Sequence, residues 1–140
     1  MTSKLPEIKL KNITKKDFRF LYDLLSERES IVNISHKKMP TYDEHVKFIM
    51  SKPYSQWHIV YFNGKKSGSV YLSKQNEIGI FVKKTFQGKR IGAQILKSVI
   101  EKNGPGRYLA NTSPRNKRSI KFFKNNGFSL IQHTYEFIKS

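Results

Sequence analysis

The chain has 140 residues, which fits one domain, and we expect residues 1–140 to fold as a single unit. Hydrophobic residues make up 37% of it, which argues against wholesale disorder. Cysteine is absent, which excludes disulfides and thiol chemistry, and no two of the four histidines are four residues apart, so we expect no metal site. No apolar run approaches the ~20 residues that span a bilayer, and the first residues carry no cleavage signal, so we expect a cytoplasmic protein without a membrane partner.

The net charge of +17 attracts anions from a distance. It admits three explanations: a nucleic-acid partner, a small polyanionic ligand, or a lysine-rich surface that only serves solubility. The basic residues are spread along the whole chain, which favours the third explanation and then a nucleotide-like ligand. No basic stripe interleaved with aromatic residues is evident, so we expect no nucleic-acid partner.

Alternation, capping and turn signals predict ten elements in chain order β-α-α-β-β-β-α-β-α-β. The first strand covers 5–13, and Thr14 caps the helix that follows it. Residues 28–40 are polar and irregular, and Thr41 with Glu44 forms a capping box for a second helix that ends before Pro53. The remaining predicted strands are at 57–62, 67–72 (joined by an Asn63-Gly64 turn), 77–82, 108–111 and 128–138. The remaining predicted helices are at 88–102, which the run Asn103-Gly104-Pro105-Gly106 ends, and at 116–126.

This order places a hairpin before a strand-helix-strand crossover. We therefore expect an α/β (α+β) fold with a mixed central sheet, flanking helices, and a short strand region at the C-terminus.

The stretch 77–93 joins a strand to a helix and carries the strongest chemical signal. The start of a helix presents free N–H groups and a positive dipole, and Gly88 and Gly92 let an anion approach while Lys89 and Arg90 add charge. Gly79 inside an apolar strand indicates a bulge or a close approach, which would offer backbone groups to an amide-bearing ligand such as pantetheine. The spacing matches neither a P-loop nor a dinucleotide fingerprint, and taken alone it is also compatible with an ordinary tight turn.

A second motif follows at 116–128. Val82, Gln87, Gly92 and Ala93 in the first motif, and Asn116, Ser119, Phe122, Phe123, Gly127 and Phe128 in the second, together resemble the GCN5-related N-acetyltransferase (GNAT) superfamily. The resemblance implies acetyl-CoA as co-substrate and no metal. By this resemblance the cofactor-binding residues are Ile80, Phe81, Val82, Gln87, Gly88, Lys89, Arg90, Ile91, Gly92, Ala93, Asn111, Asn116, Ser119 and Phe123.

The chain departs from the family pattern at three places. Arg90 stands where the family has its first glycine, and we expect it inside the first helical turn, where no positive φ is needed. Phe123 stands where many members have a tyrosine that protonates the departing thiolate. Few residues follow Gly127, so the wall of the acceptor cleft must be short or supplied by another subunit.

In this family an amine attacks the thioester directly. Glu77 is the candidate general base, and its alternatives are a solvated strand end or a water chain. Tyr135 or a water replaces the missing tyrosine as acid, or the thiolate leaves without direct protonation. The backbone N–H of Phe81 or Val82 stabilises the oxyanion.

The residue types around 28–49 resemble loosely a branch with ribosomal-protein and nucleotide-amino-sugar acetyltransferases. We therefore favour a small-molecule or nucleotide-amino-sugar amine as acceptor, with an anionic acceptor suggested by the charge, and a peptide N-terminus or lysine as the other candidates. We expect a monomer or a homodimer. A non-catalytic CoA-binding module and a nucleic-acid-binding protein are the alternative functions.

Overall fold

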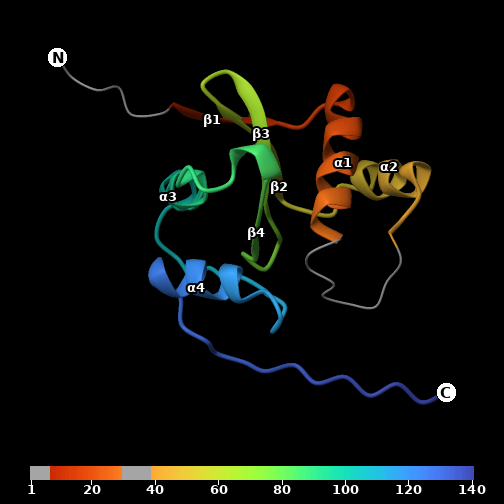
Figure 1. The fold of residues 1–140 in the computed structure, drawn as a ribbon, viewed down its shortest axis with the longest axis vertical. Helices are drawn as coiled ribbons and strands as arrows, with labels where there is room; N and C mark the ends of the chain where they lie inside the picture. The colour runs from red at the N-terminus through yellow and green to blue at the C-terminus, as the bar shows by residue number, and fades with distance from the viewer. Residues whose placement is uncertain (1–6, 30–38) are drawn as a thin grey trace.

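The computed structural model of the protein describes residues 7–29 and 39–140. Its sheet has the strand order β1-β2-β3-β4, and the strands are Ile8–Asn12, Gln56–Phe62, Lys65–Leu72 and Ile78–Val82. The helices are α1 (Phe18–Glu29), α2 (Tyr42–Met50), α3 (Ile91–Asn103) and α4 (Lys117–Asn125), and two 3-10 helices are η1 (Lys15–Asp17) and η2 (Lys84–Phe86). Helices α1 and α2 lie on one side of the sheet and α3 on the other (Figure 1).

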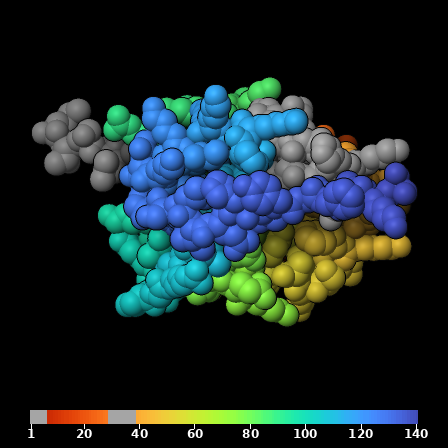
Figure 2. All heavy atoms as spheres, turned by 90° about the horizontal axis from the view of Figure 1, so that it is seen from below, coloured from red at the N-terminus to blue at the C-terminus, as the bar shows by residue number. Residues whose placement is uncertain are grey.

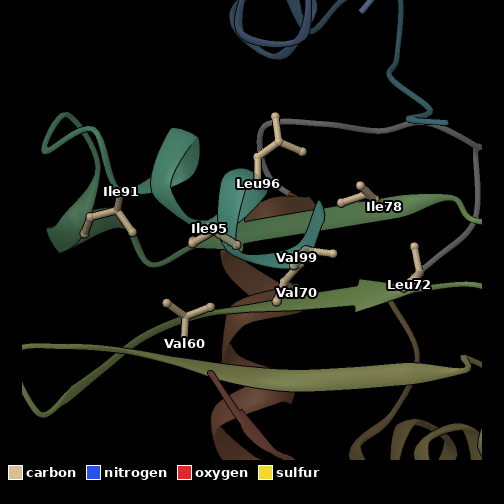
Figure 3. Close-up of a cluster of buried hydrophobic side chains, with 8 residues drawn as sticks. All are labelled: Val60, Val70, Leu72, Ile78, Ile91, Ile95, Leu96 and Val99. Carbon is tan, nitrogen blue, oxygen red and sulfur yellow. The ribbon is translucent and has the colours of Figure 1, made fainter. Parts of the chain in front are cut away.

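The larger core lies between the sheet and α3. Figure 3 shows the aliphatic side chains of α3 packed onto those of the strands. They alternate along β2, β3 and β4 as a half-buried sheet requires, and on the helix they recur at three- and four-residue spacing. The cluster consists of Val60, Val70, Leu72, Ile78, Ile91, Ile95, Leu96 and Val99.

A smaller core holds α1 and α2 to the opposite face. Leu21, Ile49 and Ile59 are its buried members. At its border the buried carboxylate of Asp17 accepts a hydrogen bond from Lys66 Nζ on β3 at 2.6 Å. This ion pair ties the start of the helical layer to the sheet.

Three local signals of the sequence are confirmed, whereas Thr14 makes no side-chain cap hydrogen bond and is followed by the 3-10 helix η1. Thr41 Oγ1 accepts from Glu44 N, and Glu44 Oε1 accepts from Thr41 N, so the capping box is complete. Asn63 and Gly64 both have positive φ, as a type I′ hairpin turn requires. Gly104 closes α3 with a φ of 81°.

The expectation of a mixed sheet is wrong for the named strands, which are all antiparallel. The predicted strand at 108–111 is reduced to one parallel bridge between Glu77 and Leu109. Pro114 follows soon after, and because proline has no N–H the segment cannot continue a ladder.

The predicted strand at 128–138 is likewise not formed. Residues 129–138 are extended and exposed and pair with no strand of the described residues, whereas Phe128 packs against the larger core. The first strand begins at Ile8 rather than at residue 5, and residues 5 and 6 lie outside the described residues, as does most of the irregular segment 28–40. Arg28 and Glu29 belong to α1. No helix of the described residues is long and apolar enough to cross a membrane.

Candidate active site

The turn between β4 and α3 is built from two left-handed residues. Gly88 has a φ of 82°, and Arg90, the N-cap of α3, has a φ of 58° and a ψ of 23°. The helix therefore begins at Ile91, and the expectation that Arg90 lies inside its first turn is wrong. Because this conformation favours glycine, Arg90 is a strained residue at the position where the family pattern has glycine.

The edge of β4 that faces away from β3 is open along Ile80 and Val82. Hydrogen bonds from Ser73 N to Glu77 O and from Lys83 N to Ser67 O show that the odd-numbered residues of this segment pair with β3. Since backbone groups alternate along an antiparallel ladder, Ile80 and Val82 direct theirs to the other side. Pairing there ends with the bond from Ile78 N to Leu109 O, so the open edge lies just beyond it.

The alternation of backbone groups along β4 distinguishes the two candidates for the oxyanion donor. The N–H of Phe81 points toward β3, whereas the N–H of Val82 lies on the open edge. The carbonyl of Val82 accepts a hydrogen bond from Gln87 Nε2 at 3.1 Å.

A cavity of about 540 Å3 lies against this open edge. It is bounded by β4, the turn, the start of α3, the side of α4 and the end of α1. All the predicted cofactor-binding residues line it except Lys89 and Asn111. Its lining consists of Leu24, Glu27, Arg28, Ile80, Phe81, Val82, Lys84, Phe86, Gln87, Gly88, Arg90, Ile91, Gly92, Ala93, Asn116, Arg118, Ser119, Phe122, Phe123, Asn125 and Asn126.

Cations dominate the charged part of this lining, which suits a polyanion. Gln87 links the two sides of the cavity mouth, because its Oε1 accepts from Arg118 Nη1 at 3.1 Å while its Nε2 bonds Val82. Lys89, outside the lining, has its Nζ 5.8 Å from the centre of the Phe86 ring.

Helix α4 approaches α3 closely at Gly92. A Cβ on Gly92 would meet the Phe122 ring at 3.0 Å, so this glycine serves packing as well as anion access. Asn116 caps α4, its Oδ1 accepting from Ser119 N at 3.1 Å, and its side chain also borders the cavity. Phe123 borders the cavity and contacts Phe128 edge-on.

Glu77 stands at the opposite end of β4 from the turn, roughly 17 Å along the strand. Its Oε1 accepts from Ser73 Oγ at 3.1 Å, and its Oε2 accepts from Asn111 Nδ2 at 2.5 Å. Asn111 thus orients Glu77 and does not border the cavity. Tyr135 lies in the C-terminal segment, is 89% exposed and does not border the cavity.

An aromatic cluster of Tyr54, Trp57, Tyr71 and Phe81 lies on the α1–α2 face of the sheet, beside Glu77. The rings of Tyr54 and Tyr71 stack with centroids 3.8 Å apart, and the Arg28 guanidinium lies 4.3 Å from the centre of the Phe81 ring. Trp57 meets Tyr54 edge-on. Burial raises the pKa of both tyrosines above the ordinary value, so each hydroxyl stays protonated at neutral pH.

The absence of a side chain at Gly79 makes room for this cluster. Tyr71 is its partner across the β3–β4 ladder, and a Cβ on Gly79 would fall within the Tyr71 ring. The β3–β4 register is continuous, so the expected bulge at Gly79 is wrong, although the close approach is real. The register shift lies instead between β2 and β3, where Val60 pairs with Gly68 and Tyr61 with Lys66, so that Ser67 is the extra residue on β3.

Sequence reasoning missed the aromatic cluster and Arg118. The first had a usable signal, because a hairpin register places Tyr71 opposite Gly79. Arg118 had none, since its contact with Gln87 joins residues 31 positions apart. His45, by contrast, is buried between the rings of Tyr22 and Phe48, which fits a packing role. Within the described residues no group of three or more His, Asp or Glu side chains could hold a metal ion.

The chain is similar to a known protein family and to several solved structures. The family model described as the acetyltransferase (GNAT) family matches residues 18–128. No curated protein sequence matches the chain. A domain from Methanocaldococcus jannaschii DSM 2661 is 28% identical, with a TM-score of 0.80 and 94% of each chain covered.

Two further solved structures share the fold at lower identity. The aminoglycoside N-acetyltransferase AAC(6')-Iy, in complex with CoA, is 18% identical with a TM-score of 0.69 and 99% of each chain covered. An acetyl transferase from Salmonella typhimurium that modifies the N-terminal serine of a 50S ribosomal subunit protein is 17% identical with a TM-score of 0.69, covering 87% of this chain and 80% of its own.

Proposed function

The chain belongs to the acetyltransferase (GNAT) family, and from this premise we propose that its cavity binds acetyl-CoA and that the acetyl group passes directly to a primary amine, with Glu77 as the general base. The observation that carries the proposal is the open edge of β4 at Ile80 and Val82, which leads from a cationic turn toward a carboxylate.

The residues present fit acetyl-CoA in two independent ways. The outward N–H and C=O groups of Ile80 can pair with amide groups of an extended arm, as a neighbouring strand would. The start of α3, with Arg90 and Arg118 beside it, suits the phosphate groups, because free helical N–H groups and guanidinium groups both favour anions. Bound acetyl-CoA supplies an activated thioester to the site.

The chain's own residues then remove the proton from the acceptor and stabilise the oxyanion. Glu77, oriented by Ser73 and Asn111, takes the proton from the ammonium form of the acceptor. The N–H of Val82 faces the open edge and serves as the oxyanion donor. Because Glu77 lies roughly 17 Å from Val82 along the strand, a chain of water molecules carries the proton from the reacting amine to Glu77. Phe123 cannot donate a proton to the leaving thiolate, so water or Tyr135 does so, or the thiolate leaves without direct protonation.

For the acceptor we propose a small molecule with a primary amine, with a nucleotide-linked amino sugar favoured and a peptide N-terminus or lysine as the other candidates. The aromatic cluster offers flat apolar faces to a sugar or a base, and Glu77 attracts its ammonium group. Arg28, which stacks on Phe81, favours an acceptor that also carries a negative group.

The first experiment measures thermal stabilisation by acetyl-CoA. Binding to the folded state alone raises stability by about 2.7 kcal/mol at a ligand concentration of 100 Kd. We expect a clear rise in Tm, and no rise at saturating acetyl-CoA would remove the proposal.

The second experiment measures free CoA thiol release with a panel of amines, followed by mass spectrometry of the products. Acceptor-dependent thiol release with a mass gain of one acetyl group supports the transfer. Stabilisation by acetyl-CoA with no release across amino sugars, peptides and small amines would favour a non-catalytic CoA-binding module. Binding to random DNA that weakens steeply with salt would support the nucleic-acid alternative.

A further inference from the structure

We propose that the Tyr71 hydroxyl is a fixed link in the path by which the proton of the acceptor reaches Glu77. The proposed function leaves roughly 17 Å between Val82 and Glu77 along β4 for water alone to bridge. The Tyr71 hydroxyl divides this distance into two shorter water bridges. The inference rests on the proposed function, because it requires transfer to an amine with Glu77 as the base.

The Tyr71 side chain reaches from β3 across β4. Tyr71 and Gly79 are partners in the β3–β4 ladder, so their backbones lie side by side. A Cβ built on Gly79 would lie 2.6 Å from the Tyr71 hydroxyl oxygen and would overlap the ring carbons next to it. Because the hydroxyl is the far end of the side chain, it stands over β4 at the level of residue 79.

The open edge of β4 begins at this level. Among the described residues, the last backbone bond on the outer side of β4 joins Ile78 N to Leu109 O, and Ile80 follows it. At roughly 3.3 Å per residue, residue 79 is about 7 Å from Glu77 and about 10 Å from Val82. Hydrogen-bonded oxygens are about 2.8 Å apart, so a few water molecules fill each of the two gaps.

Two neighbouring rings hold the Tyr71 ring, and its side chain is only half-buried. The ring stacks on Tyr54 with centroids 3.8 Å apart and planes 6° from parallel. It also meets Phe81, which lines the cavity, edge-on at 6.1 Å. The hydroxyl therefore has a defined position on a residue that water can reach.

The groups around the Tyr71 hydroxyl keep it neutral and able to donate. Burial raises its pKa, and the Glu77 carboxylate adds to this increase, whereas the Arg28 guanidinium and the Tyr54 hydroxyl lower the pKa. The increase is larger, so the hydroxyl keeps its proton at neutral pH. The carboxylate of Glu77 also attracts a proton along the path toward its own end of β4.

The relay moves one proton and leaves Tyr71 unchanged. A water molecule on the amine side gives a proton to the Tyr71 oxygen as the hydroxyl gives its own proton to a water molecule on the Glu77 side. An ammonium acceptor loses two protons when the amide forms, of which one converts the thiolate of CoA to its thiol and the other leaves along this path. Glu77 can then release that proton to solvent, because residues 74–76 beside it are exposed, and Figure 2 shows the chain that joins β3 to β4 (light green) at the surface.

The test compares Tyr71→Phe with Tyr61→Phe in the full chain. Both remove one hydroxyl from a tyrosine on the sheet, but Tyr61 packs at the smaller core and pairs with Lys66 rather than with β4. Tyr71→Phe keeps the ring over Gly79, so we expect no change in Tm or in Kd for acetyl-CoA. The amine that wild type acetylates fastest in the panel serves as acceptor, and kcat should fall by about tenfold or more in Tyr71→Phe and stay constant in Tyr61→Phe.

Two measurements separate a proton relay from a structural role. Hydroxylamine is mostly uncharged at pH 7 and has no ammonium proton to lose, so Tyr71→Phe should acetylate it at nearly the wild-type rate. In the double variant Tyr71→Phe/Glu77→Gln, kcat should be no lower than in the slower single variant, because both groups act in one path.

An unchanged kcat in Tyr71→Phe would overturn the inference and leave the proposed function standing. Equal losses with the ammonium acceptor and with hydroxylamine, or losses that multiply in the double variant, would overturn it in the same way. A wild type that acetylates no amine of the panel would instead refute the proposed transfer, and the relay with it.

Discussion

Replacing Arg90 with glycine tests two effects of opposite sign. Relief of backbone strain should raise the stability of the free protein, and loss of the guanidinium group should weaken CoA binding. The φ of 58° and ψ of 23° at Arg90 place an L-residue in the left-handed region, at a cost of about 1–2 kcal/mol. Glycine removes that cost but adds unfolded-state entropy worth about 0.5–1 kcal/mol. Arg90→Gly should therefore stabilise the ligand-free protein by roughly 0.5–1 kcal/mol, which is a Tm rise of about 2–4 °C for a domain of this size.

The same substitution should weaken CoA binding. Hydrogen bonds to charged groups contribute about 1.5–3 kcal/mol, and because Arg90 is exposed the lower end applies. We expect Kd for CoA to rise about tenfold, measured by calorimetry. Strained backbone at a ligand-binding turn can be maintained because it serves binding. The Tm of the free protein measures the strain, and the Kd for CoA measures the contribution of the Arg90 side chain to binding.

Two control variants isolate the causes. Arg90→Lys keeps both the charge and the left-handed backbone, so it should change neither quantity much. Gly88→Ala places a Cβ at a φ of 82°, where no atom lies within 4 Å, so it should lower Tm through the backbone alone. A Tm for Arg90→Gly at or below wild type would refute the strain argument, and unchanged CoA affinity would refute the phosphate contact.

Three further predictions concern other parts of the fold. Glu77→Gln should lower kcat while leaving acetyl-CoA binding unchanged, and an unchanged kcat would exclude Glu77 as the base. Gly79→Ala should destabilise by about 1–3 kcal/mol, because its Cβ displaces the Tyr71 ring, and should raise acceptor KM without changing CoA binding; an unchanged Tm contradicts this. Burial raises the pKa of Asp17, but the Lys66 ammonium and the Thr14 backbone N–H outweigh it and lower the pKa below 3.8. The ionised Asp17 carboxylate therefore stabilises the folded protein above pH 3.8, and this contribution is lost as pH falls through the lowered pKa of the folded state. Asp17→Asn should lower the free energy of unfolding by about 1–3 kcal/mol in urea at pH 7, and by less in acid.

The sequence predicts well where the interacting groups are close in the chain. The Thr41–Glu44 capping box, the Asn63-Gly64 turn and the Gly104 cap each depend on groups within a few residues, and each is confirmed. Most of the cavity lining was also predictable, because the turn and its helix are contiguous.

Features that depend on a distant partner were not predictable in this way. Alternation identifies 128–138 as strand-like, but a strand also needs a neighbour, and none is present among residues 7–29 and 39–140. The backbone of Arg90 was not predictable for a different reason. Its positive φ is unfavourable for a residue with a side chain, so the sequence predicts an ordinary helical residue there.

The position of Trp57 gives the acceptor side of this protein its own optical signal. It is the only tryptophan in the chain, and it meets Tyr54, which stacks on Tyr71 above Gly79. The cavity beside α3 does not include it. A ligand that settles on these rings should therefore change the emission of a single fluorophore, whereas acetyl-CoA should leave it nearly constant, and the order in which the two substrates bind becomes measurable without a label.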